Sequence, residues 1–111
     1  FTEFCTENEI VHQIEKKVSH DLITKGSAFW VIEDSDLISL IKIGEEMGFR
    51  IGYELGILSY NETPMKEIIR DGITVISTDF AQMGQSIARF ITNPKQTIEL
   101  FEPDVIIRNS L

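Results

Sequence analysis

Three short apolar runs, alternating with helical patterns, constrain the fold of this chain more than any other feature. The runs are AFWVI at residues 28–32, GILSY at 56–60 and TVIST at 74–78. Each is too short for a typical helix and rich in β-branched or aromatic residues, which favours a buried strand. Strands that alternate with helices predict an α/β domain with a mainly parallel sheet flanked by helices.

The segment between the first two runs predicts a helix. Its apolar residues recur at helical spacing over residues 35–48, Asp34 or Ser35 can cap its start, and Gly48 can end it. Weaker patterns predict further short elements, namely helices at 1–8, 18–26 and 65–70 and strands at 9–15, 97–101 and 104–111.

The segment 80–91 gives the clearest helical pattern in the chain. Asp79 and Gln82 have the spacing of a capping box, and Asn93 with the following proline stops the helix. Its apolar stripe consists of Phe80, Met83, Ile87 and Ile91. A stripe of this kind needs a surface to pack against.

Composition excludes several classes of function. The 111 residues suffice for one domain, and a net charge of −8 argues against direct binding of nucleic-acid phosphates. No apolar run approaches the roughly 20 residues of a membrane span, so no membrane partner is expected. The lone cysteine, Cys5, can form neither an internal disulfide nor a cysteine-based metal site, and we expect it to be a small core residue. Trp30 is also expected in the core.

Polar side chains follow the first two predicted strands. Glu33, Asp34 and Asp36 come after one, and Asn61 and Glu62 after the other. In an open parallel sheet, ligands bind outside the carboxyl ends of the strands, and carboxylates and amides suit the hydroxyls of sugars. The alternative interpretation is structural: Asp34 and its neighbour cap a helix, and Asn61 with the nearby proline turns the chain.

The residues that could support catalysis or metal binding form no recognisable constellation. The segment 33–36 lacks the spacing and glycine of a calcium loop, and no glycine-rich phosphate loop is present. Ser19, His20 and Asp21 are contiguous and cannot line up as a triad, and both His12 and His20 are expected at the surface. We therefore expect a binding module without cofactor or metal rather than an enzyme.

The stretch GILSYNETPMKEIIRDGITVISTDFAQMGQSIARFI and the closing IIRNSL resemble the effector-binding domain of lactose/galactose-repressor-type regulators. That family shares the fold of the periplasmic sugar-binding proteins. The segments SYNETP and RNSL look most similar to a subgroup with a winged-helix DNA-binding domain of the gluconate-repressor type. The resemblance implies that residues 1–111 form one lobe, plus a crossover segment, of a type I periplasmic-binding-protein-like domain. They would be its C-terminal part, with the DNA-binding domain and most of the first lobe upstream.

The resemblance also implies a site and a function. It assigns effector binding to Asn61, Glu33, Asp34, Asp36 and Phe1, although a register with Ser35 and Asp36 in place of Glu33 and Asp34 is also compatible. Asn61 replaces the family's usual Asp and Glu33 its usual Asn or Ser, which puts the best-known sugars in doubt as effectors. The implied protein is a cytoplasmic, homodimeric repressor that binds a small polyhydroxylated molecule such as a sugar, and binds DNA only through a domain absent from this chain.

Two alternatives remain open. A periplasmic sugar-binding protein of a transporter would share the fold, and a small α/β enzyme would use Asp34 and Glu62 as acid and base. The resemblance further places the helix at 80–91 against the first lobe. Without that lobe, we expect its stripe to lead to a dimer or to a displaced helix.

Overall fold

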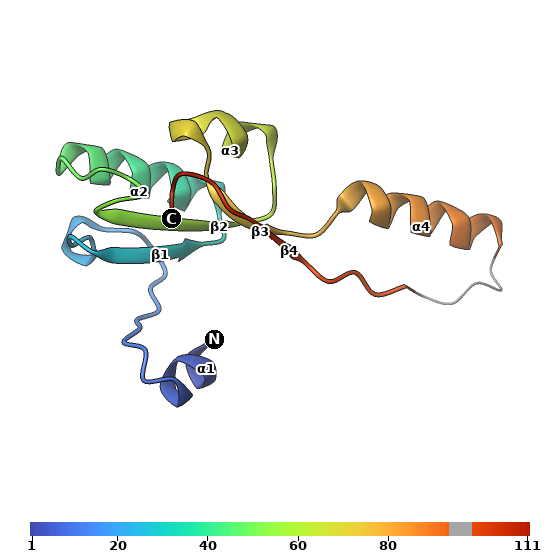
Figure 1. Ribbon diagram of the computed structural model, residues 1–111, viewed down its shortest axis with the longest axis horizontal. Helices are drawn as coiled ribbons and strands as arrows, with labels where there is room; N and C mark the ends of the chain where they lie inside the picture. Colours follow the sequence, from blue (N-terminus) through green and yellow to red (C-terminus); the bar gives the residue numbers. More distant parts are fainter. Residues whose placement is uncertain (94–98) are drawn as a thin grey trace.

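A four-stranded sheet forms the centre of the molecule (Figure 1). The computed structural model describes residues 1–93 and 99–111. The strands are β1 (Ser27–Val31), β2 (Leu55–Tyr60), β3 (Thr74–Ser77) and β4 (Asp104–Ile106), in the spatial order β1-β2-β3-β4. The first two pairs are parallel and the last is antiparallel, which confirms the predicted mainly parallel sheet.

Helices cover one face of this sheet. α2 (Asp34–Glu46) connects β1 to β2, while α3 (Pro64–Ile68) and the 3₁₀ turn η2 (Ile69–Asp71) connect β2 to β3. Both connections lie on the same side of the sheet in Figure 1. This is expected because crossovers between parallel strands are right-handed, and the two connections step across the sheet in the same direction. The core lies between this face and α2, and its fully buried side chains include Leu37, Leu40, Leu55, Ile57 and Val75. The predicted helix over 35–48 is confirmed, with Gly48 at φ +76° just beyond its end.

Trp30 does not lie in the core, contrary to the sequence prediction. Its side chain is 46% exposed because it points away from α2, whereas its neighbours Phe29 and Val31 pack into the core. The strand register places Trp30 beside Leu58 on this second face. The predicted strand is confirmed, but only one of its two faces is covered.

The N-terminal region has less regular structure than its sequence suggests. α1 (Thr2–Glu7) forms as predicted and buries Cys5. The predicted strand at 9–15 is wrong: the segment has no regular structure, and β1 pairs only with β2 among the described strands. The predicted helix at 18–26 is also wrong, apart from the 3₁₀ turn η1 (His20–Leu22). Ile23 leaves the turn in an extended conformation because this places its side chain in the core.

α4 (Phe80–Thr92) extends away from the sheet (Figure 1). Its start matches the prediction, since the Asp79 carboxylate accepts a 2.9 Å hydrogen bond from the Gln82 amide. None of its residues is buried, and Ile87 is 54% exposed. The radius of gyration is 17.2 Å, compared with about 13 Å for a compact domain of similar length. The stripe therefore stays exposed in this single chain, and the expected dimer stays a prediction.

The C-terminal segment contributes only a short strand. The strand predicted at 104–111 is confined to β4, and the one predicted at 97–101 lies partly outside the described residues, with no regular structure at 99–101. Among residues 1–93 and 99–111, no helix has both the length and the apolar character needed to cross a membrane.

Candidate functional site

The carboxyl ends of β1 and β2 lie side by side at one edge of the sheet. The two strands are parallel, and Val31 near the end of β1 pairs with Ser59 near the end of β2. The polar segment 33–36 follows β1 after one residue, and the polar segment 60–63 begins at the last residue of β2. This edge is where ligands bind in open parallel sheets, so it is the candidate site.

Lys66 joins the two polar segments. Its side chain is only 1% exposed, and its ammonium group donates hydrogen bonds to the backbone carbonyls of Tyr60 (2.7 Å) and Asn61 (2.9 Å). The same nitrogen lies 2.9 Å from Oδ1 of Asp34. Asp34 and Asn61, which are 27 positions apart in the sequence numbering, therefore share one cation.

Sequence reasoning missed Lys66. In the short helix α3, the apolar Ile68 is 78% exposed while the lysine is buried, the reverse of what residue type suggests. The one available signal was a lysine close in sequence to a strand end with an acidic segment nearby, because a buried lysine requires a partner of opposite charge.

Asn61 adopts the left-handed conformation, with φ +60°. Asparagine tolerates this region better than most residues, which fits the predicted turn. Its amide N–H donates to the carbonyl of Ile76 (2.8 Å) on β3, and its carbonyl accepts from Lys66. Both backbone groups are thus engaged in structure. Within the described part of the chain, no hydrogen-bond partner is found for its side-chain amide.

The acidic segment occupies the start of α2. Glu33 is the N-cap residue, but its backbone carbonyl rather than a side chain accepts from the amides of Asp36 (3.1 Å) and Leu37 (3.0 Å). The predicted capping by Asp34 or Ser35 is therefore wrong, because the Asp34 carboxylate turns to Lys66 instead. Glu33 is exposed and Asp36 half-buried. Carboxylates in the first turn are also favoured by the helix dipole.

Glu62 is paired with the C-terminal segment. Its Oε2 lies 2.7 Å from an Arg108 guanidinium nitrogen, and Arg108 also donates to the carbonyl of Ile73 (2.9 Å). The Glu62 amide donates to Oγ of Ser77 (2.9 Å). Glu62 therefore helps to attach the closing Arg-Asn-Ser sequence to the sheet.

Phe1 is held by a different set of contacts. Its ring meets Trp30 edge-on at 5.7 Å between centroids and His12 at the same distance. Phe1 itself is exposed. The structure thus brings Asp34 and Asn61 together through Lys66, places Glu33 and Asp36 beside them in one helical turn, and attaches Phe1 to the outer face of β1.

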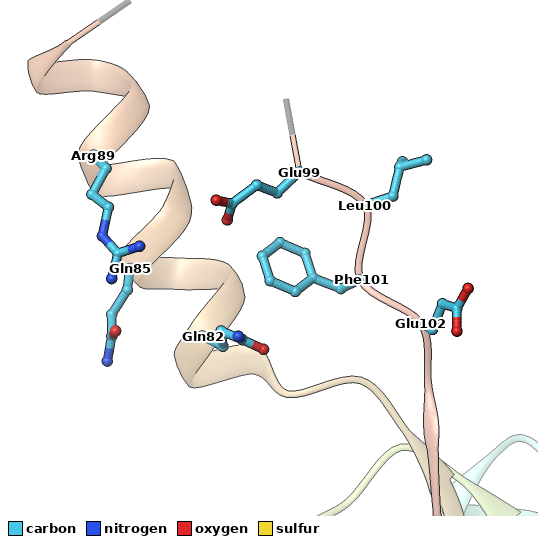
Figure 2. Close-up of a pocket in the computed structure, with 7 residues that line it drawn as sticks. All are labelled: Gln82, Gln85, Arg89, Glu99, Leu100, Phe101 and Glu102. Atoms are coloured by element: carbon cyan, nitrogen blue, oxygen red, sulfur yellow. The ribbon is translucent and has the colours of Figure 1, made fainter. Parts of the chain in front are cut away.

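A separate hollow lies between α4 and residues 99–102 (Figure 2). Figure 2 shows Glu99 and Phe101 pointing toward α4, whereas Leu100 and Glu102 point away. Ser86 of α4 donates to the Glu99 carboxylate (2.8 Å). None of the predicted site residues lines this hollow.

Comparison with known proteins identifies the family of this chain. Residues 4–111 match the family described as periplasmic binding protein-like domain. The HTH-type transcriptional regulator KdgR of Bacillus subtilis (strain 168) is 35% identical over 82 residues, which are 68% of this chain and 24% of KdgR.

Solved structures of transcription repressors have a similar fold. The Escherichia coli transcriptional repressor AscG superposes with a TM-score of 0.64 at 19% identity, over 77% of this chain and 33% of that one. The lactose repressor bound to the anti-inducer ONPF superposes with a TM-score of 0.63 at 17% identity, over 98% of this chain and 37% of that one. The chain thus spans about a quarter of KdgR and about a third of each of these repressors. With its family match over residues 4–111, the chain belongs to the periplasmic binding protein-like domain family.

Proposed function

We propose that this chain is the C-terminal part of the effector-sensing domain of a bacterial transcriptional regulator. Its candidate site would bind a small polyhydroxylated molecule such as a sugar. The observation that carries the proposal is the shared cation: Lys66 brings Asp34 and Asn61 together at the carboxyl edge of a parallel sheet. The regulators and repressors named among the similar proteins support the regulatory role.

The side chains available at the site suit hydroxyl groups. The Asn61 amide can donate and accept at once, and the carboxylates of Glu33 and Asp36 accept. Within the described residues, neither Glu33 nor Asp36 takes part in an ion pair, whereas Asp34 and Glu62 do. The remaining charge at the site is therefore negative. A neutral, hydroxyl-rich effector fits this charge, and a sugar phosphate would be repelled.

The regulatory step would follow from lobe closure. Effector held between this lobe and a second one would shift the equilibrium between open and closed forms, and a homodimer would pass that shift to a DNA-binding domain outside these residues. The exposed stripe of α4 is available for the second lobe or the second subunit. Such a regulator would act in the cytoplasm, and DNA would be contacted only through the other domain.

The two alternatives are distinguished by simple observations. A periplasmic sugar-binding protein would carry a signal peptide in the upstream reading frame, where a regulator carries a winged helix. An enzyme would need Asp34 and Glu62 free to exchange protons with a substrate, yet each already holds a cation. The pairing favours binding over catalysis at this site.

The test is calorimetric titration of the intact protein with neutral sugars, including glucose, galactose, ribose and maltose. For any sugar that the wild type binds, Asn61→Ala should weaken affinity about tenfold or more, since one or two hydrogen bonds in a partly buried site are lost. Asn8→Ala is the matched control, because Asn8 is exposed at the end of α1. Unchanged affinity for Asn61→Ala would remove Asn61 from the site.

A further inference from the structure

Lys66 is the most deeply buried charged side chain among the described residues, and the proposed function uses it only as the group that brings Asp34 and Asn61 together. We propose that Lys66 is a positioning residue: its ammonium group holds the turn at Tyr60 and Asn61 in the conformation that presents the Asn61 side chain to the effector. The part of this inference that concerns the effector rests on the proposed function.

The hydrogen bonds of Lys66 exclude a direct role in ligand binding. An ammonium group has three N–H donors, and the structure offers Lys66 three oxygen partners, the carbonyls of Tyr60 and Asn61 and the carboxylate of Asp34. The Lys66 side chain is 1% exposed and each of its three N–H groups has an acceptor, so no donor is left for a ligand. Its contribution must come through the groups that it holds.

Those groups lie at the ends of two neighbouring strands. Asp34 begins α2 after β1, Tyr60 ends β2 and Asn61 follows it. The backbone of Lys66 reaches the next strand as well, because its carbonyl accepts from the amide of Ile73 (2.8 Å), next to the start of β3. The side chain of Lys66 therefore links the carboxyl ends of β1 and β2, where the effector would bind, and its backbone is bonded to the residue that precedes β3.

The turn at Asn61 needs such a support. A left-handed conformation is disfavoured for residues other than glycine, although less for asparagine than for most, so surrounding contacts help to fix it. Here the contacts are the Ile76 carbonyl on one side and the Lys66 ammonium on the other. Without Lys66, the carbonyl of Asn61 loses its donor and the peptide can rotate. The side-chain amide would then leave its position.

Lys66 also sets the charge of the site. It compensates the Asp34 carboxylate, whose side chain is 47% exposed at the edge. Removal of the ammonium would leave that carboxylate unpaired beside Glu33 and Asp36 in the first turn of α2. Lys66 therefore has two roles. It fixes the conformation of the turn at Asn61, and it compensates one carboxylate at the edge that a neutral effector would contact.

Hydrogen exchange measured on the intact protein tests the positioning role without an effector. The variant is Lys66→Met, which keeps the length of the side chain but removes its donors, and the control is Lys42→Met on the exposed surface of α2. Two amides report on the turn: Asn61 donates to Ile76 and Glu62 to Ser77. The amide of Ile57, bonded to the Ser110 carbonyl at 2.6 Å, reports on the core.

We expect Lys66→Met to accelerate exchange in peptides covering 60–63 by about tenfold, with no change in peptides covering 55–58. Lys42→Met should exchange like the wild type in both. Unchanged exchange at 60–63, or equal acceleration in turn and core, would overturn the positioning role. Should Lys66→Met fail to fold, Lys66→Arg provides the same comparison. Its planar fork retains the charge but cannot direct three N–H groups at these oxygens, so the turn should again exchange faster than in the wild type.

Titration of the same variants with glucose, galactose, ribose and maltose separates the two claims. Any sugar bound by the wild type and by Lys42→Met should bind about tenfold more weakly to Lys66→Met, and equal affinity would overturn the link between the turn and the effector. If the wild type binds none of these sugars, the proposed effector class fails, while the exchange comparison still decides whether Lys66 holds the turn.

Discussion

Ser110 joins β2 to β3 near their amino-terminal ends, and its removal gives the clearest quantitative prediction. Its hydroxyl accepts a hydrogen bond from the amide of Thr74 (2.7 Å) and donates one to the carbonyl of Ile57 (2.7 Å). All three residues are fully buried. Ser110→Ala would therefore leave one N–H and one C=O without partners in the core.

The expected cost follows from these two groups. A buried polar group without a partner costs about 1–3 kcal/mol, so two such groups would cost about 2–4 kcal/mol, allowing for partial relaxation. The backbone carbonyl of Ser110 keeps its 2.6 Å bond from the amide of Ile57, because the substitution leaves the main chain intact. This loss is a large fraction of a typical domain stability of about 5–15 kcal/mol.

Urea unfolding of the intact protein would measure the loss as a lower midpoint at constant slope. Ser39→Ala is the control. The Ser39 hydroxyl donates only to the Ser35 carbonyl within α2, so its removal should change stability by less than about 0.5 kcal/mol. A loss below about 1 kcal/mol for Ser110→Ala would refute the claim that its hydroxyl satisfies two buried backbone groups.

Two further predictions concern backbone conformation and charge. Gly52→Ala should destabilise the fold by more than about 1 kcal/mol, because Gly52 has φ +82° and a Cβ there would overlap the carbonyl of Asn109. Gly84→Ala, with open space around it in α4, should instead be neutral or stabilising, and equal effects in urea unfolding would contradict this reasoning. A hydrogen bond from Lys25 lowers the pKa of Glu54 to about 2, so its stabilising contribution is fully present above about pH 4.5 and lost as the pH falls toward 2. Carboxyl ¹³C NMR should show this midpoint and its rise in Lys25→Met, and an ordinary midpoint in the wild type would contradict the pairing.

The sheet was predictable from the sequence because its strands are short apolar runs that bury at least one face. Ile57 and Val75 show this, since both are fully buried. The failed predictions concern segments whose structure depends on a partner. The β-branched residues Ile10, Val11 and Ile14 suit a strand, but no described strand pairs with their segment, and all three remain exposed. Periodicity also cannot tell which face of an edge strand stays uncovered, as Trp30 illustrates.

The candidate site was predictable in its location and not in its internal contacts. Parallel strands place segments 33–36 and 60–63 at one edge, which the sequence indicates. The partner of each carboxylate depends on the fold. Asp34 could equally have capped α2. It pairs with Lys66 instead because α3 places the lysine side chain within reach of its carboxylate. The sequence signal for Lys66, a lysine close to a strand end with an acidic segment nearby, does not specify its three oxygen partners.

The most direct test of the central claim is a crystal structure of the intact protein with the tightest-binding neutral sugar from the titration. We predict sugar hydroxyls within hydrogen-bonding distance of the Asn61 side-chain amide, beside the first turn of α2, with Lys66 still bound to Asp34. A sugar found away from the carboxyl ends of β1 and β2, for example in the hollow between α4 and residues 99–102, would contradict the account.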